Sequence, residues 1–566
     1  MKFSEMPYER ADLAAWKKTT ENLTARFAAA ETFEEADALY CQADRSGVDY
    51  ETMIRLAKIR RDIDTRDEFY DNEFTYYNQE LPKLQSTFQT WTEATLRSPF
   101  RPQLEEKYGK VPFLNAEISA KTFSDEIVED IQKENELTTR YSRLIASAQI
   151  PFRGETYTLS QMTPWKQDPD DEIRKAAWTA EGNWYKEHGK ELDSIYDELV
   201  QVRDAMGRKL GYDGFTQLGY YRMKRNCYSV EDVEHFRVAV QQYLVPLAKK
   251  LYMAQAKRQG REFPLSFADV DLAFRSGNPK PVGTPEEILA MGDRFYQELS
   301  PETAEFWSFM REHEVLDVQS KPGKASGGYC TRLAKYRSPF IFANFNGTAH
   351  DVEVVTHEAG HAFASYVNRD RIPSEAIWPS LEGCEVHSMS MEFFAWPWAE
   401  GFFGADARKF RYEHLKGALV FIPYGTMVDH FQHLVYEYPE FGPAERHQLW
   451  QELLGLYMPW VKPGEIPFYG DGKGWQRQKH IYEMPFYYID YCLAQTVALD
   501  FWARIREDAS EAFATYLKYT SMGGSMVFTD LLKEAGLGNP FDEGTLRRVC
   551  AAAEAYLKEY DLSGIE

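Results

Sequence analysis

The sequence predicts a mainly α-helical fold with a small β-sheet beside a helix that carries two histidines. Apolar residues recur at helical spacing among charged residues, most clearly over residues 50–74. Helix-start signals recur along the chain, such as the Thr-x-x-Glu pattern at Thr32 and the Thr-Pro-Glu-Glu run at Thr284. Residues 326–347 instead combine short aromatic and β-branched runs with Gly and Pro, which is typical of strands.

The expected elements follow one another from helices to a sheet. The first hundred residues and residues 124–148 are predicted to be helical. Residues 149–162 are β-compatible and rich in turn residues, so we expect a small hairpin there. Another helix should begin at residues 168–172, where Pro and acidic residues occupy the first turn. The Pro- and Gly-rich residues 263–283 predict a long connection, and residues 326–347 predict two strands.

The composition fits a soluble globular protein and narrows the range of its partners. Of its 566 residues, 44% are hydrophobic and 27% charged, so the chain can form a sizeable core. It has 65 Lys and Arg against 88 Asp and Glu, and the net charge of −23 argues against nucleic-acid and anionic-membrane partners. The sequence shows neither an apolar signal segment nor a membrane-spanning run. The six cysteines form no CxxC pair, so we expect reduced thiols and a cytoplasmic location.

The motif His-Glu-Ala-Gly-His predicts a metal site on a helix. His357 and His361 stand one helical turn apart on the same face, so both imidazoles can reach a single Zn²⁺. Glu358 lies beside them, where it can take a proton from a metal-bound water. Thr348 is expected to cap the start of this helix, with Asp351 as the return partner.

A third metal ligand is expected downstream of the histidines. The residues that follow the motif contain no further histidine at metzincin spacing, so an acidic residue is required. Within residues 381–394, Glu385 and Glu392 share one helical face. We choose Glu385 as the ligand and Glu392 as the partner of a zinc-bound histidine. His387 is the competing ligand but points off that face, and Glu382 is expected in the preceding loop.

Further motifs lie on both sides of the His-Glu-Ala-Gly-His segment. They are Ser-Gly-Gly-Tyr at 326–329, Asn-Phe-Asn-Gly-Thr at 344–348, the Glu-x-x-Ser-x-x-x-Glu pattern at 385–392, and His480 followed by Pro-Phe-Tyr-Tyr-Ile-Asp-Tyr at 485–491. Together these residues resemble the oligoendopeptidase F branch of the thimet-oligopeptidase-like zinc metallopeptidases. The resemblance covers about 326–495, and the segment at 151–162 is also similar to the family. One departure is His387, where relatives often carry a small residue or Pro.

The resemblance implies a two-lobed helical metallopeptidase with a deep central channel. Residues 1–200 would form an N-terminal helical lobe and residues 201–566 the catalytic lobe, and some C-terminal helices could pack back on the first lobe. One Zn²⁺ would be held by His357, His361 and Glu385, with Glu358 as the general base. The small sheet would lie beside the zinc-binding helix.

The resemblance also implies which residues meet the substrate. Backbone groups of Gly327, Gly328 and Tyr329 would bind an extended peptide, and the catalytic His480, Tyr488 and Tyr491 and the substrate-binding Tyr487 would face it across the channel. The residues alone support this weakly, because tyrosines at i, i+3 and i, i+4 spacing are more often an aromatic core stripe. A tyrosine hydroxyl is nevertheless a neutral donor that could stabilise an oxyanion.

The predicted function is zinc-dependent hydrolysis of internal bonds in short unstructured peptides. The partners are therefore short peptides, with no nucleic acid and no membrane, and the oligomeric state does not follow from the sequence. One alternative is a zinc dipeptidyl carboxypeptidase or carboxypeptidase, which would need an Arg or Lys clamp for the substrate carboxylate. Another is a peptide-binding protein with a vestigial zinc site. The intact Glu358 and a set of three ligands that leaves room for water disfavour this last alternative.

Overall fold

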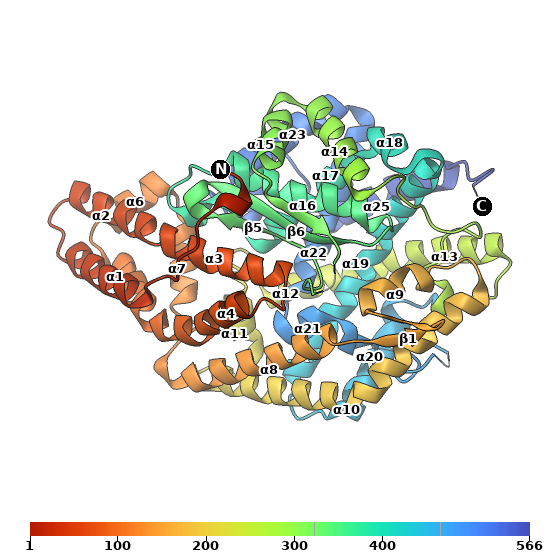
Figure 1. Ribbon diagram of the computed structural model, residues 1–566, viewed down its shortest axis with the longest axis horizontal. Helices are drawn as coiled ribbons and strands as arrows, with labels where there is room; N and C mark the ends of the chain where they lie inside the picture. The colour runs from red at the N-terminus through yellow and green to blue at the C-terminus, as the bar shows by residue number, and fades with distance from the viewer. Residues whose placement is uncertain (322, 465, 566) are drawn as a thin grey trace.

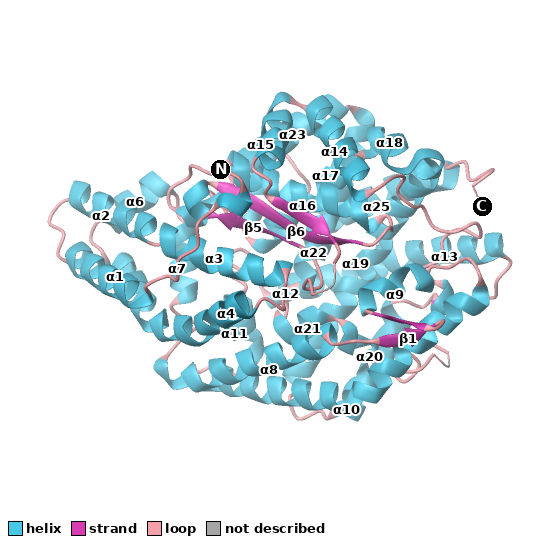
Figure 2. Cartoon of the chain, viewed as in Figure 1, coloured by secondary structure: helices cyan, strands magenta, loops and turns pink. Residues whose placement is uncertain are grey.

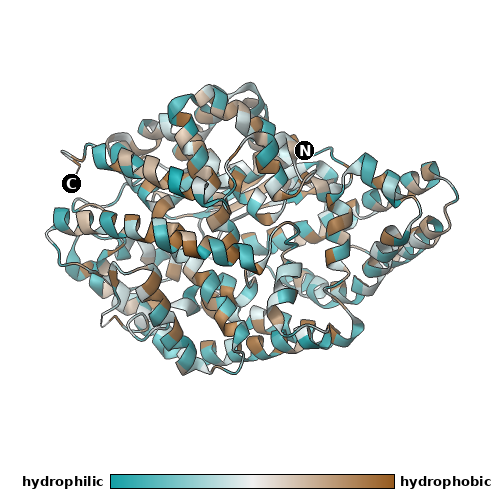
Figure 3. Ribbon diagram, turned by 180° about the vertical axis from the view of Figure 1, so that it is seen from behind, coloured by the Kyte–Doolittle hydropathy of each residue, from teal (hydrophilic) through white to brown (hydrophobic). Residues whose placement is uncertain are grey.

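Helices make up most of the chain, as the sequence predicts. The computed structural model describes residues 1–321, 323–464 and 466–565. Figure 2 shows helices around a few short strands, the longest of which lie near the centre of the molecule. Figure 3 shows hydrophilic residues on the outward-facing parts of many of these helices. Within the described residues, none of the helices combines the length and the apolar character needed to cross a membrane.

The N-terminal helices extend toward one end of the molecule (Figure 1). They are α1 (Leu13–Ala28), α2 (Phe33–Ser46), α3 (Val48–Ile63), α4 (Glu68–Glu80), α5 (Gln85–Arg97), α6 (Arg101–Tyr108), α7 (Val111–Ser119) and α8 (Val128–Ala146). The predicted cap of α2 is present, because the Glu35 amide donates to the Thr32 hydroxyl at 3.2 Å. The helical stretch predicted at 50–74 is divided into α3 and α4, and the Asp67 side chain caps the start of α4.

The next part of the chain contains the predicted hairpin and a long helix. Its elements are β1 (Ile150–Phe152), β2 (Glu155–Tyr157), α9 (Leu159–Lys166), α10 (Asp171–Lys209), α11 (Phe215–Arg222), α12 (Val230–Ala239), α13 (Val245–Gln259), β3 (Leu265–Ser266), α14 (Pro285–Leu299) and α15 (Pro301–Glu312). Strands β1 and β2 pair antiparallel, which confirms the hairpin. Thr284 and Glu287 form the capping box of α14. Residues 263–283 are mostly irregular, as predicted.

The central sheet has three strands in the order β4-β6-β5. The two strands predicted in 326–347 are β5 (Tyr329–Leu333) and β6 (Ser338–Phe345), which pair antiparallel. Strand β4 (Leu316–Gln319) pairs parallel with β6 and was not predicted. It has four residues, two of them polar, and such a run carries little strand signal without its partner. Within the described residues β5 is an edge strand of this sheet, so one side of its backbone is free of strand partners.

The C-terminal helices pack beneath and around this sheet (Figure 1). The elements are α16 (His350–Val367), α17 (Leu381–Phe394), α18 (Ala399–Phe403), α19 (Ala407–Glu437), α20 (Pro443–Tyr457), β7 (Val461–Lys462), α21 (Lys479–Glu483), α22 (Tyr488–Glu507), α23 (Ala509–Met522), α24 (Phe528–Ala535) and α25 (Glu543–Glu559). Helix α17 packs extensively against α16 and α22. All six cysteines are free thiols, as expected.

Two local predictions around α16 and α17 were wrong. Helix α16 starts at His350 without a side-chain cap, because the Thr348 hydroxyl donates to the Asn346 side chain instead. The Asp351 carboxylate accepts from the backbone amides of residues 346 and 347, which stabilises the turn before the helix. Glu382 lies in the first turn of α17 and not in a loop, because an acidic side chain is favourable at a helix N-terminus.

One hydrophobic cluster extends through most of the molecule. It contains residues from Met6 to Ile565 and includes the buried faces of α16, α17, α19 and α22. Two smaller clusters belong to the N-terminal helices, one centred on Phe27 and the other on Trp16. The elements that carry the predicted site residues therefore lie within the largest cluster, where packing fixes their positions.

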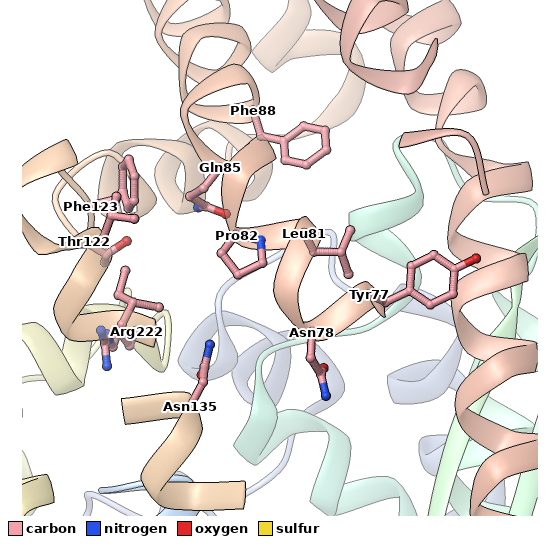
Figure 4. A pocket seen from close by; sticks show the side chains of 12 residues that line it. Tyr77, Asn78, Leu81, Pro82, Gln85, Phe88, Thr122, Phe123, Asn135 and Arg222 are labelled. Atoms are coloured by element: carbon pink, nitrogen blue, oxygen red, sulfur yellow. The ribbon is translucent and has the colours of Figure 1, made fainter. Parts of the chain in front are cut away.

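A cavity of about 430 Å³ lies between the N-terminal helices and α11, and Figure 4 shows side chains that line it. It is bordered by η2 (Leu81–Leu84), the start of α5 and the start of α8. Its 12 lining residues include Tyr77, Phe123 and Arg222, and all of them lie outside the residue set predicted for metal binding and catalysis.

Candidate metal and catalytic site

Helices α16 and α17 bring the three predicted metal ligands together. The Nε2 atoms of His357 and His361 lie 3.4 Å and 3.3 Å from Glu385 Oε2. One ligand atom from each of the three residues lies within 4.8 Å of the other two. Gly360 permits this close approach, because a Cβ atom there would lie 2.7 Å from the His387 carbonyl oxygen of α17.

The donor set fits a catalytic zinc ion. Two imidazole nitrogens and one carboxylate oxygen are the ligands of zinc peptidase sites, and three protein ligands leave a position for water or substrate. Burial would raise the pKa of Glu385, but the two histidines outweigh it and hold that pKa well below its usual range. The carboxylate is therefore ionised and available to a cation.

Glu392 orients the first histidine, in the position predicted for it. Its Oε1 lies 2.7 Å from His357 Nδ1, which leaves the Nε2 lone pair of His357 free to bind a metal. Its Oε2 lies 2.7 Å from His414 Nε2, and His414 Nδ1 accepts from Trp396 Nε1 at 2.9 Å. Burial would raise the pKa of Glu392, but the hydrogen bonds to His357 and His414 lower it to about 2. His414 was missed from the sequence, because a lone histidine on α19 carries no spacing signal.

His387, the competing ligand, lies outside the metal cluster. Its side chain is buried, and both ring nitrogens lack a hydrogen-bond partner among the described residues. Burial lowers the pKa of His387 to about 3, so the ring is neutral. Its backbone carbonyl accepts from Tyr516 at 2.9 Å, so its contacts with neighbouring helices are those of a core residue.

The loop before β5 runs beside Glu358. A Cβ atom placed on Gly328 would lie 3.7 Å from Glu358 Oε1, so the first residues of the edge strand are next to the predicted base. A Cβ atom on Gly327 would meet nothing within 4 Å. Tyr329 is engaged elsewhere, because its hydroxyl donates to Asp62 of α3 at 2.9 Å and its ring stacks on Phe342. Open space therefore borders Gly327, whereas Gly328 lies close to both Glu358 and the Phe342 carbonyl oxygen of β6.

Helix α21, the start of α22 and Tyr487 just before it bring the predicted histidine and tyrosines to the metal cluster. The Tyr487 hydroxyl donates to Glu385 Oε1 at 2.6 Å, so it contacts a predicted metal ligand. Tyr491 Oη lies 3.4 Å from His480 Nε2. The Tyr488 ring packs edge-on against His480 at 5.1 Å between centroids. Tyr487, Tyr491 and His480 are thus grouped near the metal ligands, and Tyr488 packs behind them.

These side chains are neutral hydrogen-bonding groups near pH 7. Burial, with a smaller contribution from the neighbouring Lys479, lowers the pKa of His480 to about 4. Burial also raises the pKa of Tyr491 well above its ordinary value. A neutral imidazole and neutral phenols can donate hydrogen bonds to a developing oxyanion.

A strained residue fixes the start of α22. Phe486 has a left-handed backbone with φ of 68°, which is unfavourable for an aromatic residue. Its amide donates to Gln432 Oε1 at 3.0 Å, and its carbonyl accepts from Arg225. Arg225 also donates to Asp490 Oδ1 at 3.1 Å. A Cβ atom on Gly219 would lie 2.5 Å from the Phe486 ring, so only glycine fits there.

Arg225, Gln432 and Asp490 could not be identified as site residues from the sequence. Arg225 and Gln432 stand far from the tyrosine motif along the chain, and only the fold brings them to the backbone that precedes it. Asp490 lies within the motif but points away from the metal ligands, toward Arg225 and Tyr228.

Two histidines one turn apart, a glutamate beside the first and a third ligand from a second helix define a metallopeptidase-type site. Residues 3–123 match the peptidase M3 N-terminal domain, and residues 304–550 match peptidase family M3. A solved structure of PZ peptidase A with an inhibitor is 45% identical, with a TM-score of 0.96, and the match covers 99% of this chain and 100% of that one. The chain belongs to peptidase family M3, which confirms the resemblance found in the sequence.

Curated relatives match over shorter stretches. Oligopeptidase PepF of Bacillus subtilis (strain 168) is 24% identical over 275 residues, which are 48% of this chain and 41% of that protein. The chromosomal oligoendopeptidase F of Lactococcus lactis subsp. cremoris is 25% identical over 207 residues, which are 36% of this chain and 32% of that protein. The chain thus spans less than half the length of these curated relatives.

Proposed function

We propose that the protein is a zinc-dependent oligoendopeptidase that hydrolyses internal bonds of short, unstructured peptides. The convergence of His357, His361 and Glu385 beside Glu358 is the observation that supports this most strongly. The names of the similar proteins, which are oligopeptidases and oligoendopeptidases, agree with this substrate class.

In the proposed reaction each residue has a separate task. Zinc held by His357, His361 and Glu385 would supply Lewis-acid chemistry and lower the pKa of water. Glu358 removes the proton from the attacking water and delivers it to the leaving amine. Tyr487 holds the ligand Glu385 in place through its hydroxyl.

Two further groups act on the peptide itself. Tyr491 donates a hydrogen bond to the oxygen that becomes negatively charged, because it is a neutral donor near the metal ligands, and His480 supports it through the contact between its Nε2 and Tyr491 Oη. Backbone groups at Gly327 and Gly328, at the start of an edge strand, bind the extended peptide main chain by strand addition. A folded protein cannot supply such a strand, which accounts for a preference for unstructured peptides.

The division into lobes completes the proposal. We place an N-terminal helical lobe at residues 1–200 and a catalytic lobe at 201–566, a boundary that falls near the end of the long helix α10, with the peptide held in a channel between the lobes. Enclosure in a channel would set an upper limit on the length of the peptide.

The test is mass spectrometry of a defined peptide mixture, about 5 to 30 residues long, after incubation with zinc-loaded protein. We expect internal cuts in the shorter peptides, with the longest ones spared. Stepwise loss of C-terminal residues or dipeptides would instead make the protein a carboxypeptidase or dipeptidyl carboxypeptidase. An unchanged mixture from protein that holds zinc would contradict the proposal and favour a peptide-binding role.

A further inference from the structure

A chain of four hydrogen-bonding side chains ends at Tyr491. The Tyr424 hydroxyl on α19 donates to Gln478 Oε1 at 2.9 Å. Gln478 Nε2 lies 3.0 Å from His480 Nδ1, and His480 Nε2 lies 3.4 Å from Tyr491 Oη. The chain thus crosses from α19 through α21 to α22 and stops beside the metal ligands.

The chemistry of the amide gives this chain a direction. The Gln478 amide nitrogen carries two hydrogens and can only donate, so His480 Nδ1 must present a lone pair to it. A neutral imidazole then carries its one proton on Nε2. That Nε2–H points at Tyr491 Oη, which accepts it, so His480 does not take up the tyrosine proton, which is available to the substrate or to the neighbouring Tyr487 hydroxyl.

We propose that Gln478 and Tyr424 are positioning residues that hold His480 as the Nε2–H tautomer and thereby turn the Tyr491 proton toward the peptide carbonyl. The inference rests on the proposed function, because it assigns Tyr491 to the oxyanion. Tyr424 contributes by donating to the amide oxygen, which keeps the amide nitrogen facing His480. Each donated bond polarises the next donor, so Tyr491 becomes a better donor than an isolated tyrosine.

If the hydrogen bonds ran in the opposite direction, Tyr491 would no longer donate to the substrate. If the group at position 478 only accepted, His480 would carry its proton on Nδ1 and present a lone pair at Nε2. Tyr491 would then donate to His480 and no longer to the substrate. The side-chain atom of residue 478 that faces His480 Nδ1 therefore determines whether the Tyr491 hydroxyl donates to the substrate or to His480.

The variant Gln478→Glu tests this, because a carboxylate only accepts. We expect kcat to fall by about 10- to 100-fold, less than the roughly 10²- to 10³-fold loss that follows complete removal of an oxyanion donor, because Tyr491 is redirected and not removed. KM and zinc content should stay within about twofold of the wild-type values, since no metal ligand and no strand contact changes. Gln478→Met, which removes the donor without reversing it, and Tyr424→Phe should give smaller losses.

The molecule contains a matched control of the same residue types. Gln241 Nε2 donates to Tyr457 Oη at 2.9 Å, and His430 Nδ1 lies 3.0 Å from the same oxygen. Gln241→Glu places an extra carboxylate in a half-buried Tyr–His cluster that lies outside the predicted site, and it should leave kcat within about twofold of the wild-type value.

A double-mutant cycle separates a positioning role from a general loss of structure. In a Tyr491→Phe background, Gln478→Glu should lower kcat little further, because the proton that it misdirects is already gone. Independent losses that multiply in the double variant would overturn the inference, as would equal kcat values for Gln478→Glu and Gln241→Glu. An active wild type that is insensitive to Tyr491→Phe would also overturn it. If the zinc-loaded wild type cleaves no peptide at all, the proposed function itself fails.

Discussion

Glu358 is the residue on which the proposed hydrolysis depends most. It adjoins a metal ligand on α16 and lies beside the backbone at Gly328, where a peptide carbonyl would be presented. Glu358→Gln keeps the shape of the side chain but cannot take a proton. We expect kcat to fall by about 10²- to 10⁴-fold while the protein binds one zinc ion, measured with a quenched fluorogenic peptide and by elemental analysis.

The control for this variant is Glu353→Gln, five residues earlier on the same helix. Its carboxylate lies 3.3 Å from His350 and outside the metal cluster, so activity should stay near that of the wild type. Near-full activity of Glu358→Gln would remove Glu358 from the mechanism, and loss of zinc from that variant would make it a structural residue.

The lowered pKa of His480 predicts how the free energy of unfolding depends on pH. Burial lowers its pKa from 6.5 to about 4 in the folded chain. Between these pH values the unfolded chain binds a proton that the folded chain does not, so the free energy of unfolding should fall as pH falls from 6.5 toward 4. The contribution is about 3 kcal/mol, present in full above pH 6.5 and lost at the acid end.

The measurement compares denaturant unfolding of the wild type and His480→Gln from pH 4 to pH 7.5. The difference in unfolding free energy between the two proteins should change across this range, with the wild type losing more stability at low pH. A difference that does not vary with pH would show that His480 keeps an ordinary pKa in the folded chain.

At the scale of elements, the position of α22 depends on Phe486, which precedes the helix. Phe486 holds an unfavourable backbone conformation, and Arg225 connects its carbonyl to Asp490 one turn into the helix. Both hydrogen bonds come from the Nη2 atom of Arg225. In Arg225→Lys the charge stays, but an ammonium group lacks the planar guanidinium that lies 4.3 Å over the Tyr220 ring and holds Nη2 at both acceptors. We expect kcat to fall by about tenfold, because Tyr487 and Tyr491 shift away from their positions.

The control is Arg174→Lys, which also alters a fully buried arginine. Arg174 binds Asp269 and the Ala268 carbonyl in a region without predicted site residues. Both variants should lose about 1–3 kcal/mol of stability through broken hydrogen bonds, measured by urea unfolding. Equal kcat values for the two variants would mean that Arg225 contributes to stability alone.

Some elements could be predicted from the sequence and others could not. The difference is whether an element depends on neighbouring residues in the sequence or on contacts with distant segments. The capping box at Thr284, the cap at Thr32 and the spacing of His357 and His361 are local, so these helices could be placed from the sequence. Strand β4 has four residues and forms only because β6 lies beside it. His414 and Arg225 act through contacts with distant segments, which no local pattern contains.

At the scale of the whole molecule, the N-terminal helix α3 contacts β5, an edge strand of the central sheet. The end of α3 binds the segment before β5 through its backbone, because the Ala325 amide donates to the Asp62 carbonyl at 2.8 Å. The Asp62 carboxylate accepts from the Tyr329 hydroxyl at 2.9 Å, and Lys58 lies over the ring of Tyr329. A helix remote in sequence therefore fixes the strand to which the peptide is proposed to bind.

This arrangement predicts that a change in α3 acts on substrate binding more than on the chemical step. Asp62→Ala frees the Tyr329 hydroxyl, so the backbone at 327–329 becomes more mobile and binds the peptide less well. KM should rise about three- to tenfold while kcat stays within about twofold, in steady-state assays with one peptide. Asp62→Asn, which keeps an acceptor for Tyr329, should restore most of the binding.

Asp71→Ala on α4 is the matched control, because Asp71 also pairs with an arginine of α3 but is only half-buried and, among the described residues, has no hydrogen bond or ion pair with β5. Its KM should equal that of the wild type. A fall in kcat with unchanged KM in Asp62→Ala would show that α3 supports the catalytic groups and not the peptide strand. A rise in KM for both variants would trace the effect to loosening of the N-terminal helices as a whole, because only Asp62 is tied to the strand itself.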